Sequence, residues 1–125
     1  MARVFLDANF FIDLVEQRKP VNVSQFEEQG LFISPLSIHI LVYVYRYSLP
    51  NKDLANLADY FNLVPFDQDI TYKALTGPTV DFEDNIQLHS ASSAECDLFL
   101  TRDQSLLRLG FFGKTQITQY LTKTD

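Results

Sequence analysis

The stretch RVFLDANFFIDLV, residues 3–15, decides the fold class. Its first four residues form a short apolar run that stops at Asp7, which is typical of a buried strand followed by a turn. After Asp7 the apolar residues recur at helical spacing up to Val15, so we expect a helix to follow the turn directly. A strand, a tight turn and a helix within thirteen residues indicate a unit of a parallel sheet covered by helices.

The rest of the chain repeats this alternation. Further strands are expected at 31–33, 63–66 and 98–100, with an edge strand at 113–116. Helices are expected up to Pro20, over 25–29, over 36–47 behind Ser34 and Pro35, from Asn51, from Asp67 or Asp69 to Leu75, from Asp81, and over 106–109. Buried strands alternating with helices predict an α/β fold, a three-layer α/β/α sandwich with a short parallel sheet.

Length and composition fit one domain spanning residues 1–125. The chain is 46% hydrophobic with 11 Phe and 6 Tyr, which excludes a disordered or low-complexity chain. Its single Cys excludes an internal disulfide, and no apolar run approaches the length of a signal sequence or a membrane span. These features predict a cytoplasmic protein without a membrane anchor. The net charge of −6 excludes nucleic-acid binding by a general positive field.

Three carboxylates fall where a site is expected in such a sheet, beyond the carboxyl ends of the strands. Asp7 follows the first strand, and Asp103 follows the strand at 98–100. Asp84 lies in the first turn of the helix that Asp81 opens, within reach of the same edge. Each also has a plain structural explanation, because Asp is common in turns and at helix starts, and Asp84 suits a capping box with Asp81. The residues alone leave both explanations open.

Other chemistry finds less support. Cys96 with His39 or His89 could be written as a thiol and its base, but Cys96 precedes an apolar strand and is better explained as a buried small residue. The histidines and the Cys lack zinc-site spacing, and no phosphate-binding glycine loop is present. The basic residues are scattered. Those that would line an RNA groove, if they share one face, are Arg46, Lys52, Arg102 and Arg108.

Aromatic residues cluster at two places. Tyr43, Tyr45 and Tyr47 follow an apolar helix, and with Phe10 and Phe11 they would form either core or an exposed patch. An exposed patch would suit a homodimer or a docking partner helix.

Four short motifs are spread over nearly the whole chain: Val4-Phe-Leu-Asp-Ala-Asn9, Ser34-Pro-Leu-Ser37, Asp81-Phe-Glu-Asp84 and Leu98-Phe-Leu-Thr-Arg-Asp103. In their order and approximate spacing they resemble the PIN domain family. The set is most similar to the VapC-type toxins of prokaryotic toxin and antitoxin pairs. The resemblance implies a metal-dependent endoribonuclease that uses Mg²⁺ or Mn²⁺, with an RNA substrate and an antitoxin partner. It makes Asp7, Asp84 and Asp103 the catalytic metal ligands, supported by Asn9 and Thr101.

The chain departs from the family pattern at one position. Similar proteins place a Glu three residues after a Ser or Thr in the helix after the second strand, and here that position is Ile40. His39 is a poor substitute, since adjacent helix residues point about 100° apart. We therefore expect a weak or conditional nuclease. The alternatives are a catalytically silent PIN module that acts by binding RNA or an antitoxin, and an unrelated α/β protein whose acidic residues are caps.

Overall fold

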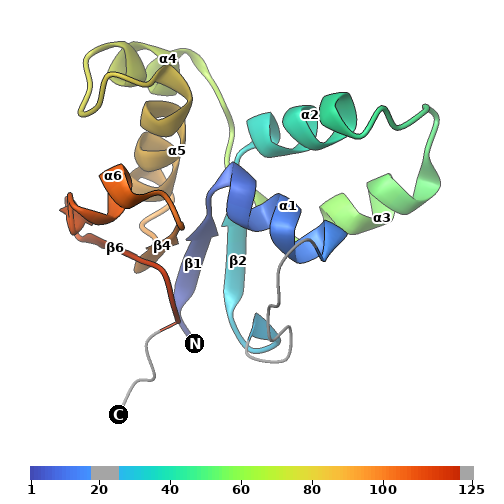
Figure 1. The fold of residues 1–125 in the computed structure, drawn as a ribbon, viewed down its shortest axis with the longest axis horizontal. Helices are drawn as coiled ribbons and strands as arrows, with labels where there is room; N and C mark the ends of the chain where they lie inside the picture. Colours follow the sequence, from blue (N-terminus) through green and yellow to red (C-terminus); the bar gives the residue numbers. More distant parts are fainter. Residues whose placement is uncertain (18–25, 122–125) are drawn as a thin grey trace.

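The computed structural model describes residues 1–17 and 26–121, as a sheet covered by helices on both faces (Figure 1). In chain order the elements are β1 (Arg3–Leu6), α1 (Ala8–Glu16), β2 (Gly30–Ile33), α2 (Pro35–Val44), α3 (Lys52–Asp59), β3 (Asn62–Leu63), α4 (Gln68–Leu75), α5 (Phe82–Ser93), β4 (Leu98–Leu100), α6 (Gln104–Leu107), β5 (Phe111–Phe112) and β6 (Thr115–Thr118). In the described ranges no helix has the length and apolar character needed to cross a membrane.

The sheet has the strand order β3-β2-β1-β4-β6-β5. All neighbouring strands pair in parallel except β5 and β6, which pair antiparallel. From β1 the chain first builds outward through β2 and β3, and it then returns to add β4 on the other side of β1. The order therefore reverses between β1 and β4, which is where parallel sheets generally place their ligand sites.

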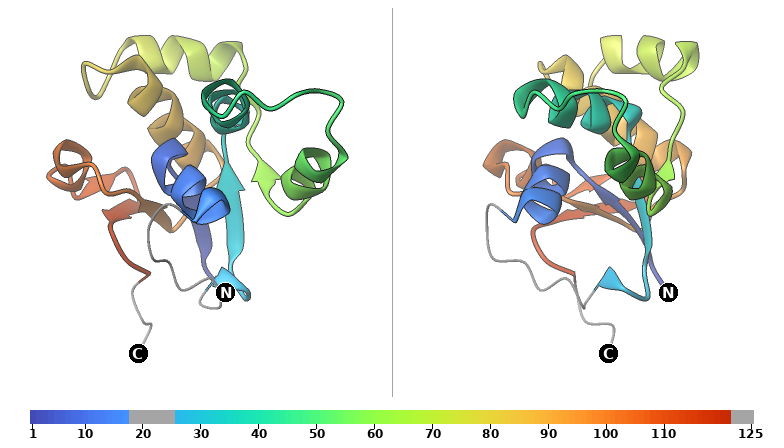
Figure 2. Two further views of the ribbon diagram at one scale, coloured as in Figure 1. Left: turned by 45° about the vertical axis from the view of Figure 1, so that its right-hand side comes forward. Right: turned by 90° about the vertical axis from the view of Figure 1, so that its right-hand side faces the viewer.

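Alternating residues of each central strand supply the two halves of the core. Val4 and Leu6 of β1 pack into a cluster with α1, whereas Phe5 between them packs with Leu88 of α5 on the other face. The same alternation holds in β2 and β4, because successive side chains of a strand point to opposite faces. The Phe5 and Phe99 rings stack at 5.4 Å between centroids. The expected three-layer α/β/α sandwich is confirmed (Figure 2).

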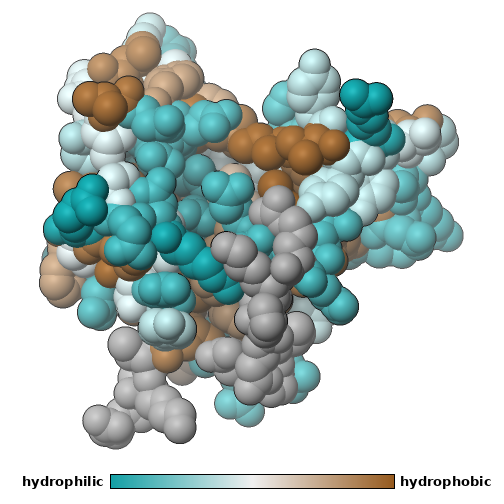
Figure 3. All heavy atoms as spheres, in the orientation of Figure 1, coloured by the Kyte–Doolittle hydropathy of each residue, from teal (hydrophilic) through white to brown (hydrophobic). Residues whose placement is uncertain are grey.

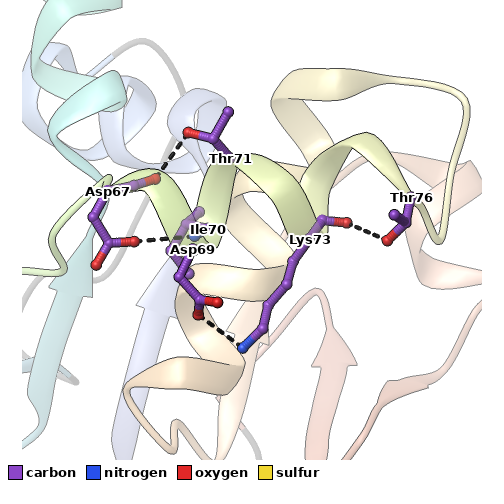
Figure 4. A network of polar contacts seen from close by, with 6 residues as sticks. All are labelled: Asp67, Asp69, Ile70, Thr71, Lys73 and Thr76. Atoms are coloured by element: carbon purple, nitrogen blue, oxygen red, sulfur yellow. Dashed lines mark hydrogen bonds and ion pairs between the residues drawn. The ribbon is translucent and has the colours of Figure 1, made fainter.

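Side-chain caps begin most of the helices, as the sequence predicts. Ser34 accepts from the backbone N–H of Leu36, with Pro35 at the first helical position, and Asn51 and Asp81 cap α3 and α5. Asp67 caps α4 by accepting from the Ile70 N–H at 3.0 Å (Figure 4). These caps satisfy amide groups that have no partner in the first turn of a helix.

Several boundaries differ from the prediction. The third strand is Asn62–Leu63 and not 63–66, because Pro65 has no N–H to continue the ladder. The helix expected over 36–47 ends at Val44, and Arg46 takes a left-handed conformation with φ 53°. The helix expected over 106–109 begins earlier, at Gln104, because Asp103 caps it.

The predicted edge strand at 113–116 is also corrected. Gly113 has φ 60° and lies in the turn between β5 and β6, so the strand begins at Thr115 and β5 forms the edge of the sheet. Of the helix expected over 25–29, Gln25 lies outside the described residues, and residues 26–29 contain no α-helix. Pro20, expected to close the first helix, also lies outside them, and α1 ends at Glu16.

Candidate active site

A pocket of about 560 Å³ lies at the point where the strand order reverses. Asp7 enters it directly after β1, Asp103 enters it from the segment after β4, and Asp84 enters it from the first turn of α5. Hydrophilic residues gather over this part of the molecule, between α1, α5 and α6, beside a hydrophobic band along α2 (Figure 3). The structure thus brings together the three carboxylates that the sequence singled out.

Asp7 is buried, with 6% of its surface exposed. Its Oδ1 caps α1 by accepting from the Phe10 N–H at 2.7 Å. Burial raises the pKa of Asp7, and hydrogen bonds from Thr101 and Phe10 oppose that rise. The side chain is therefore a helix cap and part of the pocket wall at the same time.

Asp103 lines the pocket and caps the N-terminus of α6. Its Oδ1 accepts from the backbone N–H of Ser105 at 2.8 Å and of Leu106 at 3.2 Å, and also from the Ser105 hydroxyl. That hydroxyl contact, with the two amide contacts, lowers the pKa of Asp103. Thr101 lies between the two caps, because its side chain bonds Asp7 and its Oγ1 accepts from the Asp103 N–H at 3.0 Å. The Thr101 hydroxyl thus contacts both Asp7 and Asp103, which is compatible with the supporting role expected for it.

Asp84 is not used as a cap. Asp81 accepts from the Asp84 N–H at 2.8 Å, but the Asp81 N–H is satisfied by Thr79 Oγ1 at 3.0 Å and not by Asp84. Among the described residues the Asp84 carboxylate makes no hydrogen bond. The capping-box explanation of Asp84 is therefore wrong, because Thr79 takes the role that Asp84 would have had.

Neighbouring carboxylates add to the raised pKa of Asp84 and of Asp7. Burial, followed by repulsion from Asp81, Asp103 and Asp7, raises the pKa of Asp84 to about 6. Asp103 likewise contributes to the raised pKa of Asp7. Like charges held this close favour protonation or a bound cation.

Two further predicted positions lie around the pocket. Ile40 lines it from α2, so a side chain without ligand atoms faces the carboxylates at the position of the usual Glu. Asn9, an exposed residue in the first turn of α1, lines the pocket as well. His39 is exposed and stacks on Tyr43 at 5.9 Å, and it does not line this pocket, as expected of a poor substitute.

Sequence reasoning missed four polar residues that line the pocket: Asp13, Glu83, Gln87 and Arg102. Gln87 is buried, and its Oε1 accepts from the Ala8 N–H at 2.6 Å, which ties α5 to the start of α1. A helical signal for it existed, because Gln87 follows Asp84 by three residues and shares its face. Arg102 was considered only as part of a possible basic groove.

The donor set fits a divalent cation by its chemistry. Carboxylate oxygens are the ligands that Mg²⁺ and Mn²⁺ prefer, and five carboxylates line the pocket against one guanidinium. The site is not closed, however: within residues 1–17 and 26–121 no three Asp, Glu, His or Cys side chains are grouped tightly enough to hold one ion together. Mg²⁺ usually keeps several of its waters, which lets separated carboxylates share it.

The remaining candidates have structural roles. Cys96 is buried, and burial raises the pKa of its thiol to about 12. His89 contacts the Gly77 carbonyl through Nε2 at 2.8 Å and packs edge-on against Phe112. Of the aromatic patch, Tyr43 and Tyr45 are exposed, whereas Phe10 and Phe11 are core residues of α1. Of the two alternatives left open by the sequence, the core explanation holds for Phe10, Phe11 and the half-buried Tyr47, and the exposed one holds for Tyr43 and Tyr45.

Comparison with known proteins gives a family match and similar solved structures. The sequence profile described as "PIN domain" matches residues 4–112. A solved structure described as FitAB bound to an IR36 DNA fragment has a similar fold, with a TM-score of 0.60 over 98% of this chain and 99% of that chain, at 15% sequence identity. No curated protein sequence matches.

Proposed function

This chain belongs to the PIN domain family, whose members are generally nucleases, and from that premise we propose that it is a metal-dependent endoribonuclease. The observation that carries the proposal is the convergence of Asp7, Asp84 and Asp103 on one pocket from three separate elements. Helix caps have no need to share a pocket. The raised pKa values of Asp7 and Asp84, caused by burial and by neighbouring carboxylates, are costly to a fold, and groups with shifted pKa values concentrate at functional sites.

The residues of the pocket have distinct tasks in this proposal. Asp7, Asp84 and Asp103 hold the Mg²⁺ or Mn²⁺ ion that PIN nucleases generally use. When bound, such an ion supplies an activated water and neutralises charge on the phosphodiester oxygens. Thr101 fixes Asp7 relative to Asp103, and Gln87 fixes α5 relative to α1. Asn9 supports the site from the pocket wall.

Ile40 limits the activity. A fourth carboxylate at this position would add ligand charge, and its absence weakens metal affinity because affinity for hard cations follows the charge of the ligands. We therefore propose weak or conditional cleavage. The same observation favours a second function, a catalytically silent PIN module that binds RNA or an antitoxin.

The surface of α2 supports a protein partner for either function. Only Ser37 and Leu41 of this apolar helix are buried, whereas Tyr43 and Val44 are 75% and 60% exposed. Exposed apolar surface of this kind marks interaction sites. We propose that the chain is a homodimer and is the toxin of a toxin and antitoxin pair. Specific dimers assemble at protein concentrations on the order of tens of micromolar. Sedimentation that shows only monomer at such a concentration would contradict the proposed dimer.

The test of the proposed activity uses a mixed RNA substrate. The native protein is incubated with Mg²⁺, with Mn²⁺ and with EDTA, beside the Asp7→Asn variant. Slow cleavage that requires the metal and Asp7 is the expected result. If only an Ile40→Glu variant cleaves, the native chain is the silent module, and if cleavage persists in Asp7→Asn or in EDTA, the proposed site is wrong.

A further inference from the structure

Arg102 lines the acidic pocket, and it is the one basic side chain among the described residues that line it. It lies between Thr101 and Asp103, in the segment that carries β4 into α6. A substrate phosphate that approaches this pocket meets five carboxylates and this single guanidinium. Among the described lining residues, Arg102 is therefore the one positive charge that a phosphate in the pocket can contact.

The guanidinium is held in place from two sides. Its Nη1 donates to Asp13 Oδ2 at 2.6 Å, and its Cζ lies 4.5 Å from the centre of the Phe10 ring. Asp13 is buried at 4% exposure, and both partners belong to α1, three residues apart on one helix face. Because Asp7 caps this same helix, α1 fixes a metal-binding carboxylate and the orientation of Arg102 together.

The clamped group keeps donors for a ligand. A guanidinium carries five N–H donors in a planar fork that matches two phosphate oxygens. Only Nη1 hydrogen-bonds to another described residue, and about 25% of the side chain is exposed. Holding the fork in advance removes much of the entropic cost of ordering a long side chain on binding.

We propose that Arg102 binds a backbone phosphate of single-stranded RNA and positions the phosphodiester beside Asp7, Asp84 and Asp103, with Asp13 as its positioning residue. This inference rests on the proposed nuclease function, which it deepens by assigning the protein's own phosphate contact. A purely structural ion pair between α1 and the segment after β4 would need no exposed donors and no place in the pocket wall.

The test measures binding of a fluorescently labelled single-stranded RNA by anisotropy over a range of salt concentrations, in EDTA and in Mg²⁺. For single strands, each phosphate contact contributes about 0.7 to the slope of log affinity against log salt. The variants are Arg102→Lys, Arg102→Gln and the double variant Asp13→Asn with Arg102→Gln. The double variant removes both members of the ion pair together, because taking away one partner of a buried pair destabilises a fold.

Lys114→Gln is the matched control. It removes one positive charge from an exposed residue just before β6, and this position lies at the amino ends of the parallel strands, opposite to the pocket. Circular dichroism confirms that each variant is folded. Mn²⁺ binding, measured separately by electron paramagnetic resonance, reports on the metal site independently of RNA.

The expected result is a slope smaller by about 0.7 and binding about tenfold weaker in both Gln variants of Arg102. Arg102→Lys keeps the slope but loses affinity, since a lysine lacks the fork. Lys114→Gln keeps the native slope. The proposal is overturned if the folded Gln variants of Arg102 bind RNA with the native slope, or if the native protein binds no RNA. If the native protein binds no Mn²⁺ while the slope still depends on Arg102, only the proposed metal-dependent nuclease function is refuted.

Discussion

The carboxylates of α4 and those of the acidic pocket are the same kind of group in contrasting surroundings. Asp67 caps α4, and Asp69 pairs with Lys73 at 2.9 Å on an exposed face (Figure 4). Asp7 and Asp103 also cap helices, but together with Asp84 they share one pocket, where neighbouring carboxylates contribute to the raised pKa of Asp7 and of Asp84. Capping therefore does not distinguish a structural Asp from a functional one. What distinguishes them is that several carboxylates converge on one pocket with too few cationic side chains to balance their charge.

The largest expected effect separates the two sets by activity. Asp7→Asn should lower RNA cleavage at least about a hundredfold, because a metal-binding carboxylate is lost. Its thermal stability should stay native or rise, since Asn caps a helix as well as Asp does and burial raises the pKa of Asp7. Asp67→Asn should keep cleavage unchanged. Equal loss in both variants would show that capping, and not the pocket, governs activity.

The next effect adds a charge to the pocket. Ile40→Glu should tighten Mn²⁺ binding about tenfold, because ligand charge sets the affinity for hard cations. Ile40→Gln, with the same shape and no charge, is the control and should stay near the native affinity. Isothermal titration with Mn²⁺ compares the three proteins. Equal gains in Glu and Gln would mean that polarity at this position matters and that ligand charge does not.

Stability against pH gives a smaller difference. The pKa of Asp84 is raised to about 6 from 3.8, so the folded state binds more protons between these values and loses stability as pH rises through that window. The full shift corresponds to about 3 kcal/mol, which solvent screening of this half-buried group reduces to about 1 kcal/mol.

Asp84→Asn should therefore raise the free energy of unfolding at pH 7 by about 1 kcal/mol and leave it unchanged at pH 4. Mg²⁺ should stabilise the native protein more at pH 7.5 than at pH 5, because protons compete with the metal for Asp84. Urea denaturation at several pH values measures both. A native stability that rises steadily from pH 4 to pH 7 would contradict the raised pKa of Asp84, which burial and neighbouring carboxylates cause.

The smallest effect lies on α4. Asp69→Asn removes an exposed pair with Lys73 spaced four residues along the helix, which typically contributes about 0.3 to 0.5 kcal/mol. The loss should shrink at high salt, which screens exposed pairs. Thermal unfolding at low and high salt checks this. A loss above about 1 kcal/mol would place Asp69 among the strongly coupled carboxylates and weaken the contrast.

Local sequence signals predicted much of this fold. Caps such as Ser34 and Asp81, and apolar runs such as 3–6, act through neighbouring residues, so they can be recognised without the tertiary structure. The short outer strands could not be placed in the same way, because pairing defines them: Asn62 joins the sheet by bonding β2, and Pro65 ends it. Sequence spacing also placed Asp7, Asp84 and Asp103 near one edge of the sheet.

Contacts between distant residues limited what could be predicted of the site. Arg102 and Asp13 are 89 residues apart, and Gln87 contacts Ala8 across 79 residues. Neither contact leaves a local pattern. The replacement of Asp84 by Thr79 in capping is local and has a different reason: both side chains lie close enough in sequence to accept from the Asp81 N–H, and the sequence does not decide between them.

Mn²⁺ titration followed by electron paramagnetic resonance tests the central claim most directly, that the pocket carboxylates form a divalent cation site. Native protein, Asp7→Asn and Asp67→Asn are compared at pH 7.5. The account predicts saturable binding in the native protein and in Asp67→Asn, and its loss in Asp7→Asn. Equal binding in all three proteins, or none in the native protein, would contradict it.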